Sequence, residues 1–518
     1  MERAGVKPGG RHDYFDNDTL RSGLRQKALG GAGATVASQV AIYGIQMVGT
    51  VVLARLLTPG DFGLVAMVTA FSLLLQNFGM RGFTEATIQA ETVNHRDTST
   101  LFWIQIALSA VLAMLFIALA PALAWFYGEP RLIGITVAIA VSFLLVALST
   151  QHLALLSRNL YFYRVAGNEV TAAVLAQGAA ILMALQGLEY WSLVGRRLIP
   201  LAAMAAGAWI LCRWIPGIPA FTAAIKSMLG FSMNTYANFV TSYLARNLDK
   251  ILIGWRHGAQ PLGHYERAYY LFVMPVNQLS YPLTNVAVAS LSRVRNDRER
   301  FRAHYLESLS MLALIGMPAS AVLTLTGRDL LVLLLGPQWQ MAGEIFTVFG
   351  PCIGVTLVYG THGWLHLSLG RADRWLRWGI VELLVTVACF AAGLPFGAIG
   401  VAAAYTLSFY VLTGPGLWYA GRPAGFTLRE LLSPLWSHAL SAAAAGAVSG
   451  YLLYFVEWTA GLYGASNAVV RILAASALCL GLHVLILVCL FDGKKSMANF
   501  LRFAREVLGH MVPGKSGG

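Results

Sequence analysis

The sequence has few charged residues for its length. Only 12% of its 518 residues are Asp, Glu, Lys or Arg, whereas 57% are hydrophobic and the mean hydropathy is +0.62. Such a chain has too little polar surface to cover its apolar groups in water. The composition therefore excludes a water-soluble globular protein and indicates a membrane protein.

Other signals are missing as well. The five cysteines lie in or beside apolar runs without a CxxC pair, which excludes a disulfide framework and gives no zinc-binding pattern. The first thirty residues lack the apolar core of a cleavable signal peptide, so we expect the first apolar run to direct membrane insertion. No basic domain with interleaved aromatic residues occurs, which argues against nucleic acid as a partner.

The apolar residues gather in long runs. About fourteen runs, from residues 34–54 to residues 469–491, have the roughly 20 residues that cross a hydrocarbon core of about 30 Å. They are too long for barrel strands, and only helices or closed barrels satisfy every backbone polar group in lipid. The sequence predicts an all-α polytopic membrane protein with about 14 transmembrane helices.

Basic residues are distributed unevenly between the connections. Groups such as residues 293–302 and 371–377 fall on the side that carries the N-terminus, and the other side has few Lys or Arg. Because Lys and Arg accumulate on the cytoplasmic side, and an even helix count returns the chain to that side, we predict two cytoplasmic termini. This bias and attraction to anionic membrane lipids account for the net charge of +13.

The chain contains a weak internal repeat. A shift of 200 residues places Gly63 on Gly263, Asn77 on Asn277, and one helix, turn, helix pattern on another. An even number of spans separates the copies, which predicts a parallel repeat about an axis along the membrane normal. The expected parts are an N-terminal segment (1–32), a first six-helix lobe (33–220), a second six-helix lobe (221–430), two further helices (431–491) and a C-terminal tail (492–518).

The stretch LARLLTPGDFGLVAM interrupts the first apolar region with polar residues. We expect Thr58 to cap the second helix, Pro59 to occupy its first turn and Asp61 to favour its positive end. The stretch is thus predicted to be a tight outer hairpin. Arg55, just before the turn, either extends to the membrane interface or faces a cavity.

The run LARNLDKILIG carries the largest group of intramembrane charges. Arg246, Asp249 and Lys250 are spaced i, i+3 and i+4, so they lie near one helical face. Exposing all three to lipid would cost roughly 8–10 kcal/mol, which they avoid only by facing protein or water. We expect either a cavity wall, where Asp249 exchanges a proton or sodium, or an internal ion pair.

Four further polar residues have two alternative roles each. The glutamines Gln39 and Gln46 lie seven apart on one face, and the asparagines Asn77 and Asn277 are related by the repeat. Each lines a cavity or hydrogen bonds between helices.

Three close pairs of charged or imidazole side chains also stand out. Arg81 and Glu85 form a local pair or an inner gate, and the neighbours Arg196 and Arg197 meet phosphates or mark an interface. His362 and His366 have the i, i+4 spacing of a metal pair, but no third ligand is near, so we expect packing and no metal or cofactor.

The motifs resemble those of a known family. LARLLTPGDFGLVAM, FYGEPRL, GLEYWSLV and the second-lobe stretches NLDKILIG and LGHYERAYYL occur in order. The chain resembles the polysaccharide transporter family of the multidrug/oligosaccharidyl-lipid/polysaccharide (MOP) superfamily, with Wzx-type flippases as its nearest match. The resemblance implies a V-shaped, two-lobe carrier in the bacterial inner membrane. It would move undecaprenyl-diphosphate-linked oligosaccharide units for exopolysaccharide, capsule or O-antigen synthesis, by alternating access and alongside polymerase and export machinery.

Two alternatives remain open at this stage. One is a multidrug/cation antiporter of the same superfamily, although the candidate residues include more Arg and Lys than Asp and Glu, which suits an anionic headgroup. The other is a membrane enzyme such as a polysaccharide polymerase or glycosyltransferase. Short outer connections without a carboxylate pair or a Gly-rich phosphate loop argue against it.

Overall fold

The computed structural model describes residues 24–76, 87, 94–219, 243, 247–455 and 468–491, which form helices joined by short turns and loops and contain no strand. Ten of the helices in this part are long and apolar enough to cross a membrane, or eleven if a bent pair is one span. The protein is therefore an all-α multi-pass membrane protein, and the full count of fourteen stays a prediction. The helices are α2 (Leu24–Leu56), α3 (Pro59–Gln76), α5 (His95–Tyr127), α6 (Leu132–Arg158), α7 (Phe162–Leu185), α8 (Tyr190–Cys212), α10 (Ala259–Arg293), α11 (Arg298–Leu335), α12 (Gln340–Phe349), α13 (Cys352–Gly360), α14 (His362–Ser368), α15 (Ala372–Gly393), α16 (Gly397–Gly421), α17 (Leu428–Phe455) and α19 (Ala468–Leu490).

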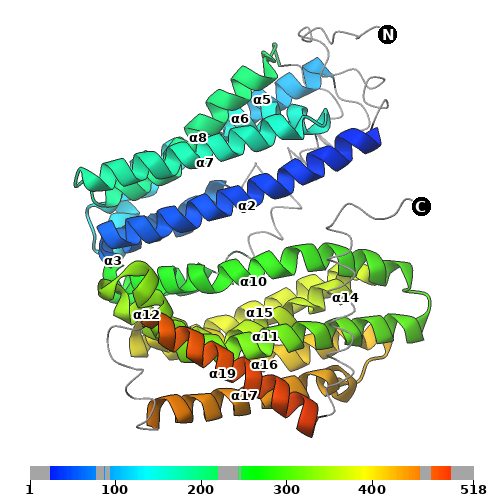
Figure 1. Ribbon diagram of the computed structural model, residues 1–518. Helices are drawn as coiled ribbons and strands as arrows, with labels where there is room; N and C mark the ends of the chain where they lie inside the picture. Colours follow the sequence, from blue (N-terminus) through cyan, green and yellow to red (C-terminus); the bar gives the residue numbers. More distant parts are fainter. Residues whose placement is uncertain are drawn as a thin grey trace, which may run out of the picture. The chain divides into compact units, whose positions relative to one another are not determined.

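The chain divides into two compact units, Met1–Gly263 and His264–Gly518. In the first unit, α7 packs against both α2 and α8, while α6 packs against α5 and α8 (Figure 1). In the second, α11 packs against α12, α13, α17 and α19, and α15 packs against α16. The lobe limits inferred from the sequence, at residues 220 and 430, remain predictions.

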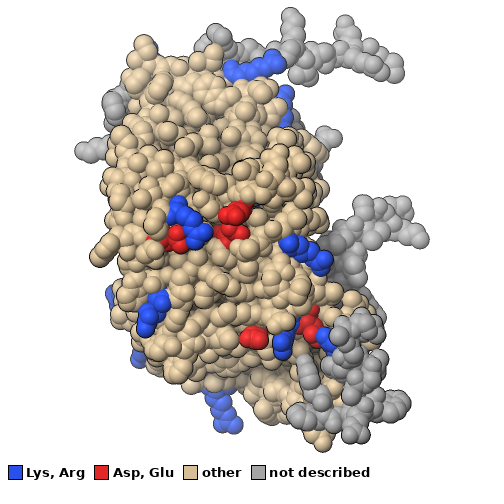
Figure 2. Space-filling view, turned by 90° about the vertical axis from the view of Figure 1, so that its left-hand side faces the viewer, with Lys and Arg blue, Asp and Glu red and all other residues tan. Residues whose placement is uncertain are grey.

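The surface carries few charges. Figure 2 shows one face with isolated groups of Lys, Arg, Asp and Glu in a largely uncharged surface. Large apolar side chains point outward from the long helices, including Val40, Leu182 and Leu473, each more than 60% exposed. An apolar outer surface is what lipid solvates, so the exposed side chains agree with the composition.

The predicted cap at the start of the second helix is confirmed, whereas the outer position of the hairpin stays a prediction. The backbone N–H and the hydroxyl of Thr58 donate to Asp61 Oδ2, at 2.9 and 2.6 Å, and the Asp61 N–H donates back to Thr58 Oγ1 at 3.3 Å. Pro59 is the first residue of α3. This is a capping box, which satisfies backbone donors that a helix start otherwise leaves without partners.

Two glycines related by the repeat lie in close backbone contact within the first unit. A Cβ on Gly63 would overlap the carbonyl of Ala259 and lie 2.9 Å from its Cα. A Cβ on Gly263 would lie 2.7 Å from the carbonyl carbon of Pro59. The 200-residue shift relates Pro59 to Ala259, so each glycine touches the counterpart of the residue that the other touches. The start of α10 therefore packs directly on the start of α3.

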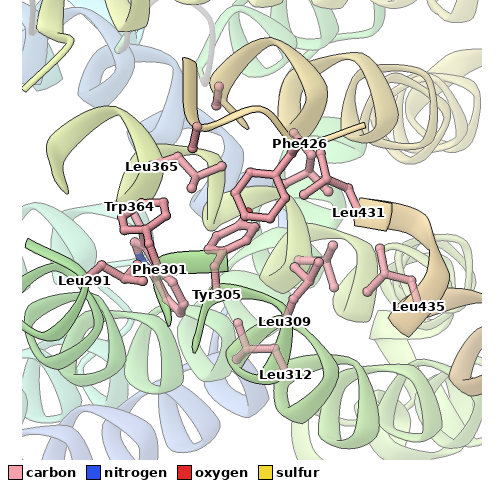
Figure 3. Close-up of a cluster of buried hydrophobic side chains, with 14 of the residues drawn as sticks. Leu291, Phe301, Tyr305, Leu309, Leu312, Trp364, Leu365, Phe426, Leu431 and Leu435 are labelled. Atoms are coloured by element: carbon pink, nitrogen blue, oxygen red, sulfur yellow. The ribbon is translucent and has the colours of Figure 1, made fainter. Parts of the chain in front are cut away.

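The core of the second unit joins α10, α11, α14 and α17 (Figure 3). Tyr305 is fully buried there, and its hydroxyl hydrogen bonds Thr361 Oγ1 at 2.8 Å. Trp364 donates its indole N–H to Thr284 Oγ1 at 2.8 Å. His362 and His366 are buried nearby with ring centroids 5.9 Å apart, and no group of three metal-ligating side chains occurs among the described residues.

One apolar helix pair is sharply bent, as in a broken membrane span or a re-entrant loop. The segments Pro337–Phe349 and Cys352–Ser368 meet at an angle of 54°, with Pro351 at the break. Val348 and Pro351 have carbonyls that accept the hydroxyls of Thr406 (2.9 Å) and Tyr410 (3.0 Å) on α16. Pro351 has no N–H to donate to the preceding turn. The two hydroxyls hydrogen bond the carbonyls at the bend to α16.

Candidate substrate and ion site

Two of the three charges in LARNLDKILIG are described. Asp249 is fully buried, and its Oδ1 accepts the backbone N–H of Lys250 at 2.8 Å. Lys250 is half-buried and donates through Nζ to Asn247 Oδ1 at 3.4 Å. Arg246 lies outside the described residues. The burial of Asp249 agrees with both a cavity wall and an internal pair, so the choice between them stays open.

The arginine pair lies on the second turn of α8, and each side chain reaches a different helix. Arg196 donates through Nη2 to Thr50 Oγ1 on α2 at 2.7 Å and toward the Gln46 carbonyl at 3.5 Å. Arg197 donates through Nη2 to Ser72 Oγ on α3 at 3.2 Å. Hydroxyl and carbonyl groups thus hold both guanidinium groups in the helix bundle.

Arg197 belongs to a buried polar group that the sequence alone did not assemble. Its Nε is buried without a hydrogen-bond partner in the described part of the chain. The Tyr243 hydroxyl, within electrostatic reach of both Arg197 and Asp249, donates to the Ala70 carbonyl at 2.7 Å. Tyr243 is therefore hydrogen bonded to α3.

The other predicted residues are not gathered at this place. Arg55 is exposed in the last turn of α2, and Gln46 is half-buried and contributes only its carbonyl to the arginine pair. Asn277 is half-buried on α10 in the second unit. Asn77, like Arg81 and Glu85, lies outside the described residues.

A carboxylate that the sequence reasoning did not single out lies between α2 and α7. Gln39 donates through Nε2 to Glu169 Oε2 at 3.3 Å, so this glutamine makes one of the interhelical bonds considered above. Glu169 is half-buried. The available signal was an acidic residue within an apolar run, which by default marks a functional position.

A turn outside the membrane spans also has a defined charge pair. Arg131 donates through Nε and Nη2 to both carboxylate oxygens of Glu129, at 2.8 and 2.9 Å. This bond lowers the pKa of Glu129. The pair lies in the FYGEPRL turn and is separate from the buried arginines.

Comparison with known proteins shows the family of this chain. The profile of a family described as polysaccharide biosynthesis protein matches residues 52–344, more than half of the chain. The chain belongs to this polysaccharide biosynthesis family. It is similar to the lipopolysaccharide biosynthesis protein WzxC of Escherichia coli, with 23% identity covering 80% of this chain and 85% of WzxC. It is also similar to the teichuronic acid biosynthesis protein TuaB of Bacillus subtilis, with 25% identity covering 82% and 89%.

Solved structures show which fold this family member has. The lipid II flippase MurJ, in an inward closed conformation, matches with a TM-score of 0.68 and 15% identity over 90% of this chain and 99% of that chain. An inward-facing multidrug resistance MATE family transporter of the MOP superfamily matches with a TM-score of 0.57 and 12% identity, over 73% and 94%. The expected MOP-type fold is confirmed.

The chemistry of the site suits an anion. Guanidinium groups present fixed donors that match phosphate oxygens, and they keep their charge inside a membrane. Arg196, Arg197 and Lys250 supply three cations in the first unit. Of the charged residues in LARNLDKILIG, the structure describes Asp249 and Lys250, and Asp249 is the acidic one.

Proposed function

We propose that this protein is a flippase for undecaprenyl-diphosphate-linked oligosaccharide repeat units. It moves them across the bacterial inner membrane by alternating access, for exopolysaccharide, capsule or O-antigen synthesis. The observation that carries the proposal is Arg197, a half-buried cation that contacts a hydroxyl and has a buried Nε without a protein partner in the described chain. A diphosphate supplies the acceptors that this group lacks.

The relatives support this class of substrate. WzxC and TuaB are named for the synthesis of lipopolysaccharide and teichuronic acid, and MurJ is a flippase for lipid II. In this proposal both termini are cytoplasmic, Asp249 couples transport to a proton or sodium gradient, and Arg55, Gln46, Asn77 and Asn277 line the route. The polymerase and export machinery receive the product on the outer side.

The test is flipping by the full-length protein in liposomes. A candidate lipid-linked glycan is added, and its exposure on each side of the bilayer is measured with and without an ion gradient. Replacing Arg197 with Gln removes charge-assisted hydrogen bonds of about 1.5–3 kcal/mol, so the rate should fall about 10- to 150-fold. The matched control is Arg131→Gln, because Arg131 pairs with Glu129 in an outer turn and should leave the rate unchanged.

Two results would contradict this proposal. Equal flipping by the Arg197→Gln protein and the wild type would remove Arg197 from the substrate route. Proton-driven efflux of organic cations without glycan flipping would favour the antiporter alternative.

A further inference from the structure

The carboxylate of Glu169 contacts a neutral amide, that of Gln39, whereas several other described carboxylates form ion pairs with arginine. Asp329 pairs with Arg471, Glu266 with Arg267, and Glu129 with Arg131. The hydrogen-bond partner of Glu169 in the described part of the chain is an amide. An arginine holds a carboxylate in its charged form, whereas an amide has both donors and an acceptor and can therefore bond either protonation state.

Glu169 lies nearer to the first end of α7 than to the other. It follows the first residue of α7 by seven positions, or about 10 Å along the helix. Arg164, near the same end of the helix, is exposed and lies 4.6 Å over the Tyr161 ring. In the predicted topology this end is cytoplasmic, so a proton reaches Glu169 after a short path from the cytoplasm.

Helices α2 and α7 approach each other closely two to three turns to either side of Gln39 and Glu169. At one end of the α2–α7 pair, a Cβ on Gly31 would lie 3.1 Å from Cβ of Phe162. At the other, a Cβ on Gly49 would lie 3.0 Å from Cγ of Gln177. Helices that approach this closely do not absorb a change of charge between them without a shift in packing.

The charged and titratable residues of the surrounding helices do not neutralise Glu169. Those with described side chains are Tyr43 and Arg55 on α2, His152 and Arg158 on α6, Tyr163 and Arg164 on α7, and Tyr190, Arg196, Arg197 and Cys212 on α8, followed by Arg213. The side chains of Arg25 and Lys27 on α2 lie outside the described part. No ion pair or hydrogen bond joins any of these to Glu169 within the described residues.

Helix α2 connects this carboxylate to the arginine pair. Gln39, Gln46 and Thr50 are separated by seven and four residues, so they lie on one face of α2. Glu169 binds the first of them, and Arg196 contacts the other two. A movement of α2 that alters one contact therefore alters the other.

We propose that Glu169 is a proton-binding site, loaded from the cytoplasm, whose occupancy is coupled through α2 to anion binding at Arg196. The charged carboxylate accepts from Gln39, and the protonated carboxyl donates to the Gln39 carbonyl oxygen after the amide turns over. One proton is taken up and released in each cycle, and no other bond is made or broken. This inference rests on the proposed flippase function and assigns the proton to Glu169, which leaves sodium as the ion for Asp249. The proton site itself does not depend on transport.

The first test is independent of transport. Infrared difference spectra of the purified full-length protein in nanodiscs, recorded between acid and neutral pH, should show a protonated carboxyl band. Glu169→Gln should remove that band, and the control Glu129→Gln should retain it. Gln39→Leu should move its midpoint to higher pH, because the charged form loses a donor. The same titration in Glu169→Gln as in wild type would overturn the proposal.

The second test measures flipping in liposomes under an imposed pH gradient. With one proton per cycle, a difference of one pH unit should change the transbilayer distribution of the lipid-linked glycan about tenfold in wild type. Glu169→Gln should reduce that factor to about one while flipping down the glycan's own gradient continues. If Asp249→Asn abolishes the pH effect and Glu169→Gln retains it, the proposal is wrong.

The two tests separate the two ideas. A carboxyl band assigned to Glu169, in a protein that flips no lipid-linked glycan, would support the proton site and contradict the proposed function. Glycan flipping with no dependence on the pH gradient would support the proposed function and contradict the coupling of Glu169 to transport.

Discussion

The contact between Gly63 and Ala259 makes a sharp prediction about stability. A methyl group on Gly63 would overlap the Ala259 carbonyl and lie 2.9 Å from its Cα, whereas carbon atoms in contact are normally about 3.5–4.0 Å apart. Both groups belong to backbone at helix starts, so no flexible side chain can turn away. Gly63→Ala should therefore force α3 and α10 apart by roughly 1 Å or more.

The cost follows from this overlap. Overpacking typically costs 1–3 kcal/mol, and a contact between two backbones should fall at the upper end. The better helix propensity of alanine offsets about 1 kcal/mol. We expect a net loss of about 2 kcal/mol in the free energy of unfolding.

Gly60→Ala is the matched control because it makes the same chemical change one turn earlier. The nearest atom to a Cβ on Gly60 is Thr58 Oγ1 at 3.7 Å, so this variant should be as stable as wild type or slightly more stable. Apparent melting temperatures of the purified proteins in one detergent provide the measurement. Gly63→Ala should melt several degrees below Gly60→Ala, and equal melting temperatures would refute the reasoning.

Three further predictions concern topology, the repeat and the charged cluster. In a background without the native cysteines, Asn296→Cys should be labelled from the cytoplasm and Arg131→Cys from outside; reversed labelling would invert the topology. An experimental structure should show two six-helix lobes related by rotation about the membrane normal, and an inverted repeat would contradict this. The double variant Arg246→Gln, Lys250→Gln should lose flipping at normal membrane abundance, and Asp249→Asn should alter the response to an ion gradient. Undiminished flipping in the double variant would reduce the cluster to an internal ion pair.

Local chemistry was predictable from the sequence because it depends on short spacings. Thr58 and Asp61 are three residues apart, and a capping box requires nothing from the rest of the chain. Membrane insertion and helical class follow from composition and from the length of the apolar runs.

Contacts between distant segments were not predictable in this way. Gln39 and Glu169 are 130 positions apart, and Arg196 is 146 positions from Thr50. The rotation and depth of each helix in the membrane decide which polar groups meet. The hydropathy of the sequence does not give this rotation or depth. The bend at Pro351 was not predicted either. Residues 343–369 form one apolar run, which predicts a single straight span, and the structure bends this run at Pro351.

The bend also shows how a membrane protein replaces a missing solvent. Water hydrates the carbonyls that a kink leaves open in a soluble helix, but lipid tails have no hydrogen-bond donors. Thr406 and Tyr410, one turn apart on α16, donate hydrogen bonds to the carbonyls of Val348 and Pro351. The two hydroxyls therefore fix the bend to α16, and position 410 is constrained even though Tyr410 is 53% exposed.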